Sequence, residues 1–200
     1  MKRIISIFTV LIVSLFAFSS VYAETMLNGA GATFPYPVYS AWAYDYNNIT
    51  GVKLNYQSIG SGGGIRQIVN RTVDFGASDN VLTPEELNKD NLLQFPAVIG
   101  GVVPVVNIPG VKEGALHLDS DAVCKIFLGE IKKWNDNKIK ELNPKLNLPS
   151  KEITVVHRSD GSGTTAIYTH YLNGACPEWK EKVGYGTSVK CPTGIGANGK

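Results

Sequence analysis

Residues 153–172 read ITVVHRSDGSGTTAIYTHYL, and this stretch decides the fold class. Its first residues are mostly β-branched, which is typical of a strand. A turn of glycines, hydroxyls and one aspartate follows, and a segment with helical apolar spacing begins directly after it. A strand that passes through a short turn into a helix is the repeating unit of α/β proteins. We therefore expect an α/β fold.

Strand-like and helix-like segments alternate along the rest of the chain. Residues 36–46 carry tyrosines and a tryptophan at helical spacing, residues 52–58 alternate like a strand, and residues 65–70 predict a short helix. Further helices are expected at 120–134 and 136–143. This alternation supports the same fold class.

Two stretches do not fit the alternation. Residues 92–108 (LLQFPAVIGGVVPVVNI) form an apolar run rich in Val and Ile, as in buried strands. Prolines and a Gly-Gly pair break the run, so it predicts a crossing between two lobes rather than one helix. Residues 190–200 are glycine-rich, and we expect no further element there.

The first 23 residues predict a secretory signal peptide. Lys2 and Arg3 precede a short apolar core, and the small-residue pattern VYA ends at Ala23. A transmembrane anchor is the alternative, but the core is shorter than a bilayer of roughly 30 Å requires. We therefore expect residues 24–200 to be a soluble, exported product.

The charge balance argues against a polyanion partner. Removing Lys2 and Arg3 from the 19 basic residues leaves 17, which equals the 17 acidic residues. A protein without a net positive field is a poor candidate for binding nucleic acid or an anionic membrane. An anion would have to be held by local, directed dipoles.

The three cysteines are too few for a disulfide scaffold. Cys176 and Cys191 are candidates for a disulfide in an oxidising compartment, and free thiols are equally open. Cys124 lies on the expected apolar face of a helix and is interpreted as a buried small hydrophobe. No cysteine pair has zinc-knuckle spacing, so no metal site is predicted.

Three turns share one pattern: GAGATFP (29–35), IGSGGG (59–64) and SDGSGTT (159–165). Each ends where a helix is expected to begin, and each places a hydroxyl beside glycines. Glycines let backbone N–H groups approach a ligand closely, and a helix start offers unpaired donors and partial positive charge. The three turns together predict an anion site.

Two other uses of these turns fit less well. GSGGGIR lacks the Lys-Ser/Thr end of a phosphate-binding P-loop, and GAGATF has Phe34 where a dinucleotide fingerprint needs glycine. The DGSGT around Ser162 lacks the first glycine of a nucleophile elbow. His157 and His170 are also poorly spaced to act as its base, and we interpret them as structural.

The charged residues near the turns suggest selectivity. Arg158 can donate to the oxygens of a tetrahedral anion, and Asp160 can hold its guanidinium in place. Asp79 would repel an anion unless the ligand carries a proton to donate. Phosphate carries one near neutral pH and sulfate does not, so Asp79 would favour phosphate. An ordinary helix cap or surface acid is the alternative interpretation of Asp79.

Six segments together resemble the PstS family, the periplasmic phosphate-binding proteins of ABC transporters. They are GAGATFPYPVY, YQSIGSGGGIRQI, VDFGASD, QFPAVIGGVVPVVNIPG, FLGEIKKWND and RSDGSGTT. The segments follow one another in family order from residue 28 onward. They are long enough to be specific.

The resemblance implies a phosphate site with contributions from both lobes. In the first lobe, Thr33 and Phe34 would supply backbone and hydroxyl donors, and Ser61 would donate from the second turn. Asp79 would accept the proton of the phosphate.

In the second lobe, the resemblance implies that Arg158 pairs with the ligand and that Asp160 steadies Arg158. Ser162, Gly163 and Thr164 would donate from the start of a helix. No catalytic residue, metal or cofactor is implied.

The family fold has two α/β lobes with the ligand in the cleft between them. We expect residues 24–104 in the first lobe and 105–200 in the second. Family members continue further, so the second lobe and the return to the first lobe would be incomplete here.

The function implied is high-affinity binding of inorganic phosphate in the periplasm by a monomer without enzymatic activity. The protein would deliver phosphate to the membrane permease subunits of an ABC transporter, which a cytoplasmic ATPase drives. Two alternatives are a binding protein for another tetrahedral oxyanion, such as sulfate, and an exported phosphate-ester hydrolase with Ser162 as nucleophile.

Overall fold

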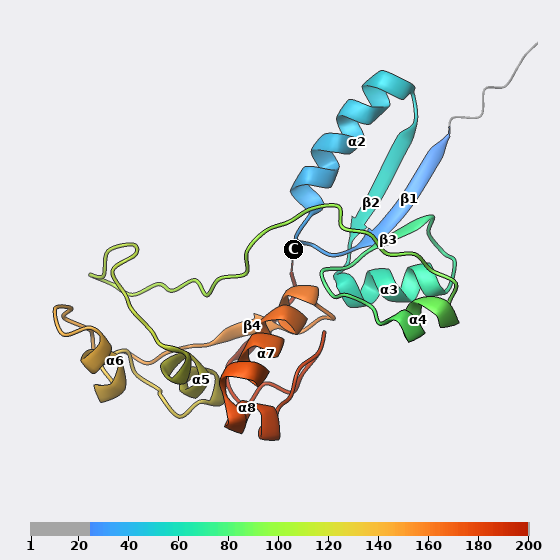
Figure 1. Cartoon of the computed structure of the whole chain (residues 1–200). Helices are drawn as coiled ribbons and strands as arrows, with labels where there is room; N and C mark the ends of the chain where they lie inside the picture. Colours follow the sequence, from blue (N-terminus) through green and yellow to red (C-terminus); the bar gives the residue numbers. More distant parts are fainter. Residues whose placement is uncertain (1–24, 200) are drawn as a thin grey trace, which may run out of the picture.

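The computed structural model describes residues 25–199, and the predicted signal peptide lies outside this range. Two groups of elements are joined by an extended segment (Figure 1). We call residues 25–91 the N lobe, 92–107 the crossing segment and 108–199 the C lobe. Within residues 25–199, no helix is long and apolar enough to cross a membrane. The mixture of strands and helices confirms the predicted α/β class.

The N lobe contains a parallel sheet of three strands. They are β1 (Met26–Gly31), β2 (Lys53–Ser58) and β3 (Phe75–Ala77), in the order β2-β1-β3. The sequence indicated only a turn at Gly29 and Gly31, yet both lie in the central strand β1. A Cβ on Gly29 would lie 2.1 Å from Cζ of Phe75, so glycine makes room for that ring.

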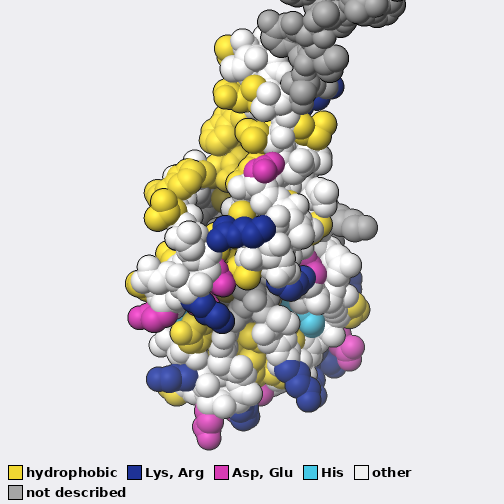
Figure 2. Space-filling view, turned by 90° about the vertical axis from the view of Figure 1, so that its right-hand side faces the viewer, with side chains coloured by type: hydrophobic (Ala, Val, Ile, Leu, Met, Phe, Trp, Pro, Cys, Tyr) yellow, Lys and Arg dark blue, Asp and Glu magenta, His cyan; other side chains and the backbone are white. Residues whose placement is uncertain are grey.

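Three helices follow these strands: α2 (Tyr36–Thr50), α3 (Ser61–Val69) and α4 (Pro84–Lys89). The predicted helix after residue 35 is confirmed, and it ends at Gly51, whose φ of 73° is left-handed. Helix α4 begins with a capping box between Thr83 and Glu86. None of the residues of α2 is buried, and Trp42 is 52% exposed. Figure 2 shows hydrophobic side chains gathered on the upper part of the molecule, where α2, β1 and β2 lie in Figure 1.

The crossing segment differs from the sequence prediction. It was expected to contain buried strands, but it carries neither strand nor helix, and Leu93 and Ile99 are each 97% exposed. Buried strands need apolar neighbours on both faces, and the described chain places none around these side chains. Pro96 and Pro104 also remove N–H donors from strand pairing. In Figure 1 this segment runs between the N lobe and the C lobe.

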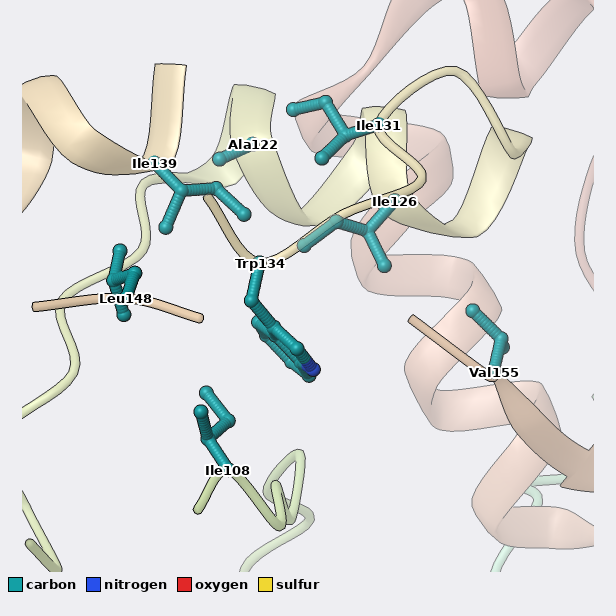
Figure 3. Packing of buried hydrophobic residues seen from close by; sticks show 8 residues of the cluster. All are labelled: Ile108, Ala122, Ile126, Ile131, Trp134, Ile139, Leu148 and Val155. Carbon is teal, nitrogen blue, oxygen red and sulfur yellow. The ribbon is translucent and has the colours of Figure 1, made fainter. Parts of the chain in front are cut away.

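The C lobe is mainly helical. Its elements are α5 (Ser120–Leu128), α6 (Asn137–Leu142), β4 (Val156–Arg158), α7 (Gly163–Ala175), α8 (Pro177–Lys182) and β5 (Ile195–Ala197). Trp134 lies within a core of aliphatic side chains (Figure 3). Burying such side chains contributes about 1.5–3 kcal/mol each and is the main stabilising term of this lobe. The cluster contains Ile108, Ala122, Ile126, Ile131, Trp134, Ile139, Leu148 and Val155.

One helix end and one strand of the C lobe were predicted wrongly. Helix α5 ends at Leu128 rather than continuing to Trp134, because Gly129 adopts a left-handed φ of 79°. The glycine-rich stretch near residue 195 was expected to hold no element, but β5 pairs with β4 in parallel. Glycine weakens a strand without forbidding it, and pairing with β4 supplies the missing stability.

The disulfide joins Cys124 to Cys176, and Cys191 is free. The candidate pair Cys176–Cys191 was therefore wrong, and so was the interpretation of Cys124 as only a small hydrophobe, although Cys124 is buried as expected. The fold explains the choice, because Cys124 on α5 meets the junction of α7 and α8 in a small core with Leu172 and Trp179. The short sequence separation of Cys176 and Cys191 suggested their pairing, but the disulfide depends on how the helices pack.

Candidate functional site

The predicted anion contacts of the N lobe each follow the end of a strand. Strands β1, β2 and β3 end at residues 31, 58 and 77, and Thr33, Ser61 and Asp79 come shortly after them. Carboxyl ends of parallel strands share one edge of a sheet, where ligands bind in open α/β folds. Arg158 is the last residue of β4 in the C lobe, and its side chain reaches Thr33 at this edge of the sheet.

Arg158 connects the two lobes. Its Nη1 donates a hydrogen bond of 3.1 Å to Oγ1 of Thr33 in the N lobe. Its Nε donates to Oδ1 of Asp160 at 2.6 Å, and its Nη2 donates to Oδ2 of the same carboxylate. These contacts use three of the five guanidinium N–H donors and leave two for a further acceptor.

Asp160 fixes the orientation of that guanidinium through a bidentate ion pair. The hydrogen bonds from Arg158 hold the pKa of the Asp160 carboxyl below its usual range. The N–H of Gly199 also donates to Oδ1 of Asp160, at 3.4 Å. Asp160 is thus ionised near neutral pH and holds Arg158 in one geometry.

Asp79 lies at the contact between the lobes. Its backbone N–H donates to Oγ of Ser61 at 3.1 Å, and Oγ1 of Thr164 donates to its Oδ2 through a long hydrogen bond of 3.4 Å. Burial raises the pKa of the Asp79 carboxyl, although Thr164 and the positive charge of Arg158 act in the opposite direction. This carboxylate is an acceptor among donors, as the sequence suggested.

Two tyrosines near Asp79 were not identified from the sequence. Burial raises the pKa of both Tyr39 and Tyr56, and the negative charge of Asp79 adds to the effect. The Tyr56 hydroxyl donates to the carbonyl of Ala32 at 2.7 Å, which ties it to the end of β1. The alternation of residues 52–58 indicated a strand but gave no sign of this neighbour.

The third turn starts α7. Ser162 is 1% exposed, and its Oγ accepts the N–H of Thr165 at 3.2 Å, which makes it the helix cap. Gly163 follows directly, packed so closely that a Cβ there would lie 2.5 Å from Oγ of Ser61. Hydroxyl and N–H groups from both lobes therefore meet at one place.

A nucleophilic role for Ser162 finds no support in its surroundings. Nδ1 of His157 is 3.0 Å from the carbonyl oxygen of Arg158, and the ring of His170 packs against Tyr185. Ser162 takes part in neither contact. Its hydroxyl is placed as a capping acceptor that can still donate its hydrogen.

Phe34 is the remaining predicted residue, and its side chain points elsewhere. The ring is 42% exposed and packs over Gly100 of the crossing segment, where a Cβ would lie 2.3 Å from its Cζ. Any role of Phe34 toward an anion would use its backbone N–H at the start of α2.

A groove and the acidic side chains of the described residues offer no better candidate site. A groove of about 600 Å³ lies between α3 and the sheet, lined among others by Asn28, Gln57 and Arg66, and none of the predicted anion contacts lines it. In the described residues, no group of three or more His, Cys, Asp or Glu side chains is placed to hold a metal ion. The meeting point of the turns remains the candidate site.

Comparison with known proteins identifies the family of this fold. Residues 20–198 match the family model described as a PBP superfamily domain. The chain belongs to the PBP superfamily. Two of its relatives are the phosphate-binding proteins PstS of Pasteurella multocida, 58% identical over 173 residues, and of Haemophilus influenzae, 57% identical over 173 residues. Each alignment covers 86% of this PBP chain and 50% or 52% of the relative. The chain spans about half the length of these relatives.

Solved structures support the PBP fold. An ABC-type phosphate transport receptor from Vibrio cholerae aligns with a TM-score of 0.50 and 18% identity, covering 86% of this chain and 63% of the receptor. A Clostridium perfringens substrate-binding protein, assigned to a phosphate ABC transporter and solved with bound phosphate, aligns with a TM-score of 0.57 and 24% identity. This alignment covers 74% of this chain and 56% of the Clostridium perfringens protein. At these identities the likeness concerns the fold alone.

Proposed function

We propose that this chain binds inorganic phosphate between its two lobes, as the ligand-holding part of a periplasmic receptor for an ABC importer. The observation that carries the proposal is the convergence of four strand ends. Arg158 reaches Thr33, and Asp79 reaches both Ser61 and Thr164. The relatives named phosphate-binding protein support the same ligand.

The chemistry of the site favours a tetrahedral anion that keeps a proton. Arg158 supplies positive charge and two further N–H donors, and the helix starts at Ser61 and Gly163 supply N–H groups and partial positive charge. Asp79 can only accept when ionised, so it is satisfied by a ligand that donates. Monohydrogen and dihydrogen phosphate meet this requirement.

Binding would work by closure of the lobes, without catalysis or a cofactor. Thr33, Ser61 and Asp79 belong to the N lobe, whereas Arg158 and Thr164 belong to the C lobe. A ligand that contacts both sets favours the closed arrangement by its differential affinity. The closed monomer would then present phosphate to the permease subunits of the importer and their ATPase.

Titration calorimetry with inorganic phosphate tests the proposal on the whole chain, after exchange into phosphate-free buffer. We expect one phosphate per chain and a loss of affinity of about tenfold or more in Arg158→Met, because charge-assisted hydrogen bonds contribute about 1.5–3 kcal/mol. Lys125→Met is the matched control, since its charge lies in an exposed ion pair with Asp121. Absence of phosphate binding by the wild type, or equal affinity in Arg158→Met, would contradict the proposal.

A further inference from the structure

Two glycines from different lobes touch at the candidate site. The N–H of Gly62 donates a hydrogen bond of 3.0 Å to the carbonyl oxygen of Gly161. A Cβ on either glycine would lie 3.1 Å from the Cα of the other, which requires a shift of a few tenths of an ångström. Neither residue has a positive φ. Glycine is needed here for clearance, and not for backbone conformation.

Two further glycines extend the same contact. A Cβ on Gly60 would lie 2.5 Å from the carbonyl oxygen of Gly161 and 2.8 Å from Oδ2 of Asp160. A Cβ on Gly163 would lie 2.5 Å from Oγ of Ser61 and 2.6 Å from Cβ of Asp79.

We call Gly60, Gly62, Gly161 and Gly163 the glycine seam. Its members come from the second and third turns, which face one another across the lobes. The seam is distinct from packing inside a lobe, such as that of Gly64 in α3, where a Cβ would meet Gly31 of β1 in the same lobe.

We infer that the glycine seam sets the closest approach of the two lobes and thereby the affinity for phosphate, an inference that rests on the proposed function. Donors from the two lobes must reach the same anion at about 2.7–3.2 Å, and hydrogen bonds weaken steeply outside good geometry. A methyl group in the seam holds the lobes apart. It weakens contacts to phosphate that the substitution itself does not touch.

Alanine substitutions at Gly62 and Gly161 test the seam most cleanly, because both residues lie outside the proposed set of phosphate contacts and both backbones accept alanine. Gly174→Ala is the matched control, since a Cβ there meets nothing within 4 Å. Circular dichroism and thermal melts establish that each variant folds.

The readouts are the distance between the lobes and the affinity for phosphate. Spin labels on the free Cys191 and on Tyr44→Cys, an α2 position that is 70% exposed, report the distance by pulsed electron resonance with and without phosphate. Calorimetry gives the Kd. We expect Gly62→Ala and Gly161→Ala to lengthen the distance and raise the Kd about tenfold, and Gly174→Ala to change neither.

The outcomes separate the seam from the proposed function. Unchanged distances in both seam variants, or longer distances with unchanged phosphate affinity, would overturn the inference. A wild type that binds no phosphate would contradict the proposed function. In that case the distances without phosphate decide the seam alone, with lengthening in both variants supporting it and no change overturning it.

Discussion

The guanidinium of Arg158 donates to the hydroxyl of Thr33 at 3.1 Å, a contact between residues 125 positions apart in the sequence. It joins the turn after β1 to the end of β4 and therefore crosses from one lobe to the other. The Asp160 carboxylate holds Arg158 from its other side. The orientation of Arg158 thus depends on both lobes.

Thr33→Val is expected to weaken phosphate binding roughly tenfold, because it removes the acceptor that positions Arg158 and leaves a donor unpaired. Titration calorimetry measures the change. Thr72→Val is the matched control, since the Thr72 hydroxyl bonds only locally to the carbonyl of Gln67 in the described structure. Equal losses in the two variants would show that the contact with Arg158 has no special role.

Asp79→Asn is expected to stabilise the fold at neutral pH. Because burial raises the pKa of Asp79, the unfolded chain ionises first as the pH rises, and stability is lost between the ordinary aspartate pKa and the raised folded value. Asparagine removes this loss. Urea unfolding should show the variant to be more stable at pH 7 and equal to the wild type once the carboxyl is protonated in both states. A destabilised variant at pH 7 would refute this account of Asp79.

Asp160→Asn is expected to change stability in the opposite direction. The pKa of Asp160 is lowered by its hydrogen bonds with Arg158, so its contribution is present above the ordinary aspartate pKa and is lost as the pH falls through the folded value. Urea unfolding should find the variant less stable at pH 7, with a difference that shrinks in acid. A pH-independent difference would mean that packing, and not charge, is responsible.

Ser162→Ala is expected to lower the free energy of unfolding by about 1 kcal/mol through loss of the α7 cap. Ser120→Ala is a suitable control, because Asp119 caps that helix instead, and its effect should stay within about 0.5 kcal/mol. Neither the wild type nor the variants should hydrolyse a chromogenic phosphate ester. Turnover by the wild type that Ser162→Ala abolishes would restore the hydrolase alternative.

The candidate site was largely predictable because its residues follow strand ends. Parallel strands bring their carboxyl ends to one edge, so turns such as those of Ser61 and Asp79 meet whatever their spacing in sequence. The role of Asp160 beside Arg158 was likewise readable from a spacing of two residues. The closeness of Tyr39 and Tyr56 to Asp79 was not predictable, because it depends on how α2 lies against the sheet.

Other features depend on packing that no local pattern reports. Cys176 pairs with the distant Cys124 because α5 packs against α7, whereas Cys191 is nearer in sequence. The apolar run that contains Leu93 has the composition of a buried strand, yet burial also requires neighbours that the described chain does not place there. The local sequence indicates which structure a segment favours, but it does not show which other segments pack around it.

Competition between phosphate and sulfate tests the central claim most directly. Calorimetry at pH 7 on the whole chain should find phosphate bound and sulfate weaker by about 100-fold or more, because sulfate has no hydrogen to donate to Asp79. Asp79→Asn should narrow this difference, since an amide can also donate. A wild type that binds the two anions equally, or binds neither, would contradict the account.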